Sequence, residues 1–232
     1  MASPGELIDI ISAVTGIPRP RVFSGHRYLR EAHLVTQGGR GPSAAKMSAR
    51  DAAHILIAAC SSAEIKDSAS AIERPGGLVS AAGQWRPSVL SIPELLELPA
   101  NHSFADALEA LIASASSGTL QRAFMEMEQG QVDLIHDPSP ATNIEVTIYG
   151  PTPRGAILLE KLVTDEQGAG HRNQENSDRH FYGNLRAEPG SGDLAWYDIS
   201  TPRELDSDLQ TSATFSHRTI AAIGKLLARS NK

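Results

Sequence analysis

The sequence predicts an α+β protein, in which helices near both ends accompany an antiparallel sheet. Two observations support this fold class. Apolar residues recur at helical spacing near the N-terminus, at Leu7, Ile10, Ile11 and Val14, and this period is typical of a helix with one buried face. Residues 144–149, by contrast, alternate strictly between apolar and polar side chains, as a half-buried strand does.

The first two helices are separated by a glycine and two prolines. Gly16 supplies a stop for a helix over residues 6–14. Pro18 cannot continue that helix because proline lacks an amide donor, whereas Pro20 can occupy the first turn of a new one. We therefore expect a second helix over residues 20–33.

A hairpin and a third helix are expected next. Residues 34–36 are β-prone, and the glycines of residues 37–46 favour a tight hairpin with cations near its tip. Residues 47–48 would complete the return strand. Ser48 is a suitable N-cap for an apolar helix over residues 49–60.

The composition then changes to Ser, Ala, Gly and Pro, which is typical of a connecting segment. We interpret residues 63–100 as a linker with one short helix near residues 93–98. This divides the chain into an N-terminal domain, residues 1–62, and a C-terminal α+β domain, residues 101–232, in which an antiparallel sheet packs with helices.

Within the C-terminal domain, Asn101 or Ser103 can cap a helix that Gly118 interrupts. The alternating run at residues 144–149 and the run at 156–162 predict an antiparallel pair. Two further strands and a final helix complete the domain. We expect these strands at residues 181–186 and 194–199 and the helix cap at Thr214 or Ser216.

The charge of the chain is unevenly distributed. The whole chain has a net charge of −6, yet residues 17–50 contain seven Lys or Arg residues and one acid, Glu31. A block of +6 within an acidic chain indicates a module that faces a polyanion, joined to one that is solvated or binds a partner.

The order helix, turn, helix, hairpin and helix resembles a winged helix-turn-helix regulator. The resemblance lies in residues 7–22 and 27–35, with Gly16 and Ile17 in the turn and residues 39–41 in the wing. It implies that the N-terminal domain binds double-stranded DNA in a sequence-specific way. The recognition helix would be residues 20–33, and the basic wing residues 36–48.

A helix fits the major groove and presents side chains to base edges, while cations neutralise phosphates. The expected contacts are of three kinds. They are Ser24, Arg27 and Tyr28 at base edges, Arg19, Arg21 and Arg30 at phosphates, and Arg40 and Lys46 at an adjacent backbone or the minor groove. The alternative is a solvated basic face on a winged helix that binds protein.

Lone reactive side chains are expected to be structural. Cys60, the only cysteine, ends an apolar helix and is expected in the core. It cannot form an intrachain disulfide or a multi-cysteine zinc site. His26 and His33 lie near the apolar side of the second helix, so we expect packed, hydrogen-bonded imidazoles there. His171, Asp178 and His180 are expected in a solvated loop.

No pattern predicts an enzyme. The sequence has no Gly-x-Ser-x-Gly nucleophile elbow, no helix-borne metal-ligand pair and no phosphate-binding loop. We therefore expect no catalytic residue, no metal and no cofactor. No apolar run has the length of a membrane span, and we expect a cytoplasmic protein without membrane contact.

The predicted function is a transcriptional regulator that acts as a homodimer on double-stranded DNA, with a C-terminal domain that mediates dimerisation or binds a protein partner. Dimerisation is expected because two half-sites multiply a weak affinity. One alternative is a DNA-packaging or assembly protein of a phage or mobile element, which would use the same domain in a higher oligomer. Another alternative is an enzyme with an active site in the C-terminal sheet. No set of residues in the sequence supports this alternative.

Overall fold

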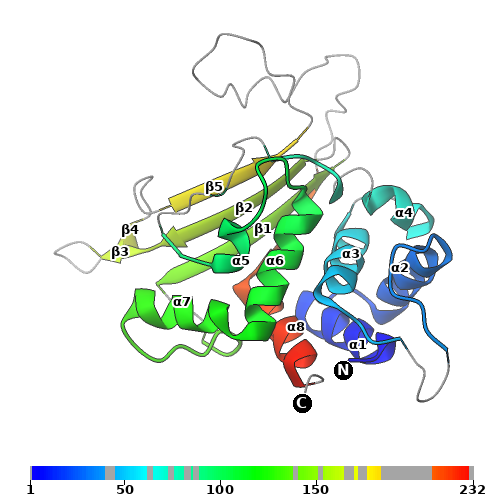
Figure 1. The fold of residues 1–232 in the computed structure, drawn as a ribbon, viewed down its shortest axis with the longest axis horizontal. Coiled ribbons are helices and arrows are strands. Elements are labelled where there is room, and N and C mark those ends of the chain that lie inside the picture. The colour runs from blue at the N-terminus through cyan, green and yellow to red at the C-terminus, as the bar shows by residue number, and fades with distance from the viewer. Residues whose placement is uncertain are drawn as a thin grey trace, which may run out of the picture.

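The chain folds as an α+β protein in the computed structural model, with helices packed beside an antiparallel sheet (Figure 1). The predicted fold class is thereby confirmed at this coarse level. The structure describes residues 2–39, 45–61, 65–72, 76–80, 85, 89–137, 141–150, 154–164, 170–171, 177–183 and 211–229.

Three helices form the N-terminal part. They are α1 (Pro4–Thr15), α2 (Arg19–Glu31) and α3 (Ala49–Cys60). The Ser48 hydroxyl accepts a hydrogen bond from the Asp51 amide, and the Asp51 carboxylate accepts one from the Ser48 amide. Such a reciprocal cap satisfies amides that the first helical turn leaves without partners. The predicted bounds of the third helix are confirmed, and α2 ends two residues before the predicted end.

The segment between α2 and α3 contains no strand in its described residues, 34–39 and 45–48. The prediction of two β-strands flanking a hairpin is therefore wrong for these residues. The chain still turns back on itself, because a Cβ atom on Gly38 would lie 2.1 Å from the amide nitrogen of Ala45. Only a residue without a side chain permits this approach.

Side-chain and N-terminal partners replace the missing strand pairing. The Thr36 amide donates to the Asp51 carboxylate at 2.7 Å, and the Met47 amide donates to the Ala2 carbonyl oxygen at 3.0 Å. The segment is thus held by the start of α3 and by Ala2, two residues before α1, and it needs no β-ladder to satisfy these backbone groups.

The region interpreted as a linker contains short elements and buried side chains. Its elements are a 3₁₀ turn (Ile65–Asp67), α4 (Ser68–Ala71) and α5 (Pro93–Leu96), the last of which confirms the short helix expected there. Leu78, Trp85, Leu90 and Leu95 each expose at most 3 % of their surface. These residues belong to the same cluster of buried apolar side chains as residues of α1 and α8.

The main sheet has the strand order β5, β2, β1, β6 and is antiparallel throughout. Its strands are β1 (Thr142–Gly150), β2 (Arg154–Lys161), β5 (Ser177–Tyr182) and β6 (Thr211–Ser216). The register of the central pair places Val146 opposite Ile157. A separate pair is formed by β3 (Val163–Thr164) and β4 (Gly170–His171). The predicted antiparallel pair is confirmed.

Two details of the sheet differ from the prediction. The third strand runs from Ser177 to Tyr182 rather than over residues 181–186, and β6 was not predicted as a strand. The strand expected at residues 194–199 lies outside the described residues. The solvated loop predicted for His171, Asp178 and His180 is also wrong, since His171 lies in β4 and Asp178 and His180 lie in β5.

The remaining helices frame the sheet. They are α6 (Phe104–Ser117), α7 (Thr119–Glu128) and α8 (His217–Arg229), which follows β6 directly. Ser103 caps α6 and Gly118 separates α6 from α7 in a left-handed conformation, as predicted. Ser216, one of two predicted caps, accepts a hydrogen bond from the Arg218 amide at 3.4 Å.

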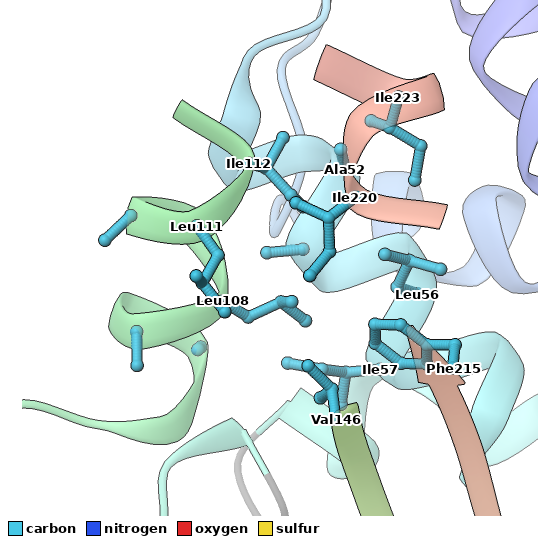
Figure 2. Packing of buried hydrophobic residues seen from close by; sticks show 14 of the residues in the cluster. Ala52, Leu56, Ile57, Leu108, Leu111, Ile112, Val146, Phe215, Ile220 and Ile223 are labelled. Atoms are coloured by element: carbon cyan, nitrogen blue, oxygen red, sulfur yellow. The ribbon is translucent and has the colours of Figure 1, made fainter. Parts of the chain in front are cut away.

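The core joins the N-terminal helices to the sheet. Side chains of α3, α6, α8, β1 and β6 converge in one cluster (Figure 2). In addition, α1 packs against α8 and α3 packs against α6. The segments predicted as separate domains therefore share a core. Helix α2 lies at the end of the molecule away from the sheet, where it contacts α1, α3 and α4 (Figure 1).

Candidate nucleic-acid interface

One side of helix α2 is buried against the rest of the protein. The residues on its opposite side are therefore the ones available to a partner. Val22 and Leu29 are fully buried, and Gly25 lies between them on this side. A Cβ atom on Gly25 would lie 3.2 Å from the Cδ1 atom of Ile65. The small residue thus allows the 3₁₀ turn to pack closely, and the helix is anchored by one face only.

The opposite side of α2 carries an exposed aromatic ring and three arginines. Phe23 exposes 49 % of its surface, and Arg19, Arg27 and Arg30 are exposed. At about 100° per residue, the three arginines lie within roughly 40° of Phe23 around the helix axis. We call this set, Arg19, Phe23, Arg27 and Arg30, the α2 face.

Two of the three arginines have acidic neighbours. Arg19 Nε lies 2.6 Å from an Asp9 carboxylate oxygen, and Arg27 Nε lies 3.4 Å from a Glu31 carboxylate oxygen. All four side chains are more than half exposed. Exposed pairs of this kind contribute about 0–1 kcal/mol, so a phosphate can replace either carboxylate at little cost.

Ser24 and Tyr28 lie at the border of the α2 face. Both side chains are half-buried, and by helical spacing they lie roughly 100° to 140° from Phe23. The Arg27 guanidinium is 4.9 Å from the centroid of the Tyr28 ring. Tyr28 therefore supports Arg27 through a cation–π contact, and Arg27 is the more accessible of the two.

Arg21 faces the interior of the N-terminal part. Its guanidinium donates hydrogen bonds to the carbonyl oxygens of Ala59 and Ser61, at 3.4 and 3.3 Å. These carbonyls lie at the end of α3, where the helix leaves them without amide partners. Arg21 thus fixes α2 to α3, a role that the sequence does not indicate because its partners are 38 and 40 residues away.

The structure places one of the two cations predicted on the wing, Arg40 and Lys46. Arg40 lies outside the described residues. Lys46 is exposed and lines a groove of about 460 Å³ together with Ser116 and Leu227, at the ends of α6 and α8. Lys46 is thus placed beside the C-terminal part of the molecule.

Arg50 belongs to the same basic stretch but has acidic neighbours on another element. Its Nη1 atom lies 3.4 Å from a Glu109 carboxylate oxygen and 3.9 Å from Asp106, both on α6. The fold therefore divides the basic block of the sequence. Part of its charge lies on the α2 face, and part is balanced by acids of the C-terminal half.

The histidines of this region differ in burial. His26 is 7 % exposed, and burial, together with the nearby Arg30 charge, lowers its pKa. It is therefore neutral at pH 7, as expected for a packed imidazole. His33 is exposed and has a φ of 58°, so the prediction of a packed imidazole is wrong for this residue.

Apart from the α2 face, a cluster of buried polar and aromatic side chains lies in the interior of the protein, and the sequence did not predict it. The Ser80 hydroxyl is 2.8 Å from His180 Nε2, and His180 stacks on Trp85 with ring centroids 4.1 Å apart. His102 Nε2 lies 3.0 Å from the Tyr182 hydroxyl. Ser80 and His180 expose 8 and 6 % of their surface. We assign this cluster to packing, since it joins the segment before α5 to β5.

Among the described residues, no group of three or more His, Cys, Asp or Glu side chains is arranged to hold a metal ion. No helix in the described part of the chain has the length and apolarity needed to cross a membrane. Comparisons with known protein families, with curated proteins and with solved structures found no match. The candidate interface therefore depends on the geometry and charge of α2.

Of the predicted contact residues, the structure brings Arg19, Arg27 and Arg30 together on one face. Phe23, which is not among the predicted contact residues, lies on the same face. The pattern contains a usable signal, because Phe23 lies four residues after Arg19, four before Arg27 and seven before Arg30. An aromatic ring at this spacing shares its face with the cations and not with Val22 and Leu29.

Proposed function

We propose that the α2 face binds double-stranded DNA and that the chain is a sequence-specific transcriptional regulator. The observation that carries this proposal is the exposed stripe of three arginines around Phe23, on a helix anchored by its opposite side. The chain as a whole has a net charge of −6, so an excess of cations on one helix favours a polyanionic partner over general solvation.

The position of α2 suits a helix that enters the major groove. The groove is about 12 Å wide and admits an α-helix. Helix α2 lies at the end of the molecule, so the elements behind it need not approach the duplex (Figure 1). Its arginines can exchange exposed carboxylate partners for phosphates, which releases counterions from the DNA.

The residues have distinct proposed roles. Arg27 forms bidentate hydrogen bonds to a base edge, with Ser24 and Tyr28 beside it, while Arg19 and Arg30 contact phosphates. Arg40 and Lys46 are proposed to contact the adjacent backbone or the minor groove. Arg21 acts indirectly, because two of its donors hold α2 on α3.

The test is selection of binding sites from random-sequence duplexes, with the wild type, Arg27→Ala and Arg50→Ala at several salt concentrations. Arg50→Ala is the matched control, since it removes one cation of the same basic stretch that lies beside Asp106 and Glu109. We expect Arg27→Ala to relax the base preference and Arg50→Ala to retain it. Absent or salt-insensitive binding of the wild type would overturn the proposal.

The division between base and phosphate contacts is tested with a second pair of variants. Arg27→Ala should change base preference, whereas Arg40→Ala should weaken binding to all sequences and lower the salt slope by about one. Equal effects of the two substitutions on preference and slope would contradict these roles.

The proposed regulator acts as a homodimer, and the acidic C-terminal half supplies the dimer contact or binds a protein partner. Two copies are expected because each α2 offers few base contacts, and linked half-sites raise the effective affinity. The mass of the protein in solution tests this. A dimer supports the regulator, whereas a closed higher oligomer supports a DNA-packaging role and excludes this part of the proposal.

A further inference from the structure

The aromatic ring at the centre of the α2 face has no role in the contacts assigned above. Among the described residues, Phe23 has the highest exposed fraction, 49 %, of the large apolar side chains. Its neighbours one turn away along α2 are Arg19, Pro20, His26 and Arg27, of which the two arginines are exposed cations. An exposed apolar ring between cations is unfavourable in water, and it gains free energy once a partner covers it.

We propose that Phe23 contacts the 5-methyl groups of thymines in the major groove and gives the protein a preference for thymine. This inference rests on the proposed function, because it concerns the same face and the same duplex. It goes further in naming a base, a chemical group of that base and the residue that recognises it.

Positive charges lie on both sides of the Phe23 ring along α2. Arg19 and Arg27 lie one helical turn before and after Phe23, and Arg30 lies two turns after it. In the proposed function, Arg19 and Arg30 contact phosphates and Arg27 contacts a base edge. A ring between them is then directed at the floor of the groove rather than at bulk water.

The second step is the chemistry of that floor. The major groove presents hydrogen-bond donors and acceptors from every base pair, but the thymine methyl is its distinctive apolar group. Phe23 can offer neither a donor nor an acceptor, so a base edge without a methyl would lose water contacts and gain nothing from the ring. Apolar contact with a methyl is the interaction that the ring can form.

The experiment compares thymine with deoxyuridine, which lacks only the methyl group. Each thymine of a selected duplex is replaced singly, and the dissociation constants are measured for the wild type and Phe23→Ala. We expect the wild type to bind about fourfold more weakly at one or two positions, which corresponds to one methyl-sized group removed from water. Phe23→Ala should show no loss at those positions.

Phe23→Leu is the second variant, since it keeps an apolar side chain and should retain part of the discrimination. Both substitutions affect an exposed residue, so circular dichroism and thermal melting should match the wild type. Equal deoxyuridine penalties for the wild type and Phe23→Ala would overturn the inference. So would a wild type that is insensitive at every thymine, or a selected site that contains none.

Two further results would also contradict the inference. If Phe23→Ala converts an oligomer into a monomer, the ring holds two subunits together and does not face DNA. If the wild type prefers single strands, the ring stacks on bases instead of contacting a methyl. A wild type that binds duplex DNA without any deoxyuridine effect would leave the proposed function standing, whereas a wild type that binds no DNA would remove both.

Discussion

At the scale of single residues, the end of α2 depends on His33 in a left-handed conformation. His33 has a φ of 58°, its amide donates to the Arg30 carbonyl oxygen, and the Leu34 amide donates to the Leu29 carbonyl oxygen at 2.9 Å. This pair of hydrogen bonds closes the helix as a Schellman motif. Glycine is the usual residue at such a position, because any Cβ atom is strained there.

We predict that His33→Gly stabilises the protein. The substitution removes the Cβ strain while both closing hydrogen bonds remain, and the gain should be about 1 kcal/mol. For a chain of this size the melting temperature should rise by roughly 2–4 °C. His33→Ala is the control and should give no increase, since alanine keeps the Cβ atom. A lower melting temperature for His33→Gly would contradict this account of the helix end.

Cys60 provides a second residue-scale prediction. Burial raises the pKa of its thiol to about 12, and the nearby Arg21 offsets only part of that effect. The thiolate is the reactive form of cysteine, so the native protein should react with a disulfide reagent at pH 8 far more slowly than a free cysteine does. Reaction in denaturant should be fast. Equal rates in the native and denatured states would contradict the raised pKa of this half-buried thiol.

Residue roles could be predicted where the partner is close in sequence. Ser48 and Ser103, the latter with Asn101 as the alternative, were predicted as caps because each lies next to an apolar helical run, and both are confirmed. Arg21 could not be assigned in this way, because the carbonyl oxygens that it contacts come from the end of another helix. Its charge predicted a phosphate contact, and its position in the fold gives it a structural partner.

At the scale of elements, α6 and α8 approach each other at a glycine. A Cβ atom on Gly224 would lie 2.4 Å from the Cβ atom of Ala115 and 2.7 Å from its carbonyl carbon. The clash would involve the backbone of α6, so no side-chain rotation can relieve it. This contact holds the final helix in place, and α8 in turn packs against α1.

We predict that Gly224→Ala destabilises the protein by about 1–3 kcal/mol, because the two helices must move apart. Gly5→Ala is the matched control. Gly5 is also in a helix, but a Cβ atom there would meet nothing within 4 Å, so stability should be unchanged or slightly higher. Denaturant unfolding of both variants measures the difference. Similar midpoints for the two variants would show that the α6 and α8 contact is not tight.

Elements with strong periodicity were predictable, whereas those that depend on distant partners were not. Residues 49–60 and 104–117 carry apolar side chains at helical spacing, and both are helices. Strand β6 has the sequence Thr-Ser-Ala-Thr-Phe-Ser, in which Phe215 is the one large apolar residue. It forms a strand because it pairs with β1 at the edge of the sheet. The sequence of residues 211–216 does not indicate this pairing partner.

At the scale of the whole molecule, the helices of the basic stretch are not independent of the acidic half. Helix α1 packs against α8, α3 packs against α6, and Arg50 lies beside two α6 carboxylates. Composition alone predicted a linker at residues 63–100, yet its described residues include the buried Trp85 and Leu90. Burial of such isolated apolar residues depends on tertiary contacts, and it leaves no periodic pattern in the sequence.

Buried histidines make the stability of the whole fold sensitive to acid. The pKa of His217 is lowered to about 4, mainly by burial. Burial is also the main cause that lowers the pKa values of His26 and His102. An unfolded chain titrates its histidines near pH 6.5 and so binds more protons than the native protein below that pH. The free energy of unfolding should therefore fall as the pH falls from about 6.5 towards about 4.

The pH prediction is measured by urea unfolding between pH 7.5 and 4.5, with the wild type and His217→Gln. Glutamine does not titrate, so the variant should lose less stability over the same interval than the wild type does. Its stability at pH 7.5 serves as its own reference, which separates lost packing from lost titration. An identical pH dependence for the two proteins would contradict the assignment to His217.

Binding of duplex DNA by the α2 face can be tested by comparing two triple variants of equal charge. One converts Arg19, Arg27 and Arg30 to Gln, and the other converts the exposed Arg50, Arg179 and Lys225, which lie on α3, β5 and α8. Affinity for a random-sequence duplex is measured against salt concentration. We expect the α2 variant to lose at least about tenfold in affinity and to lower the salt slope by about two, while the other variant stays close to the wild type. Equal losses in the two variants would contradict this expectation, because binding would then follow net charge and not this face.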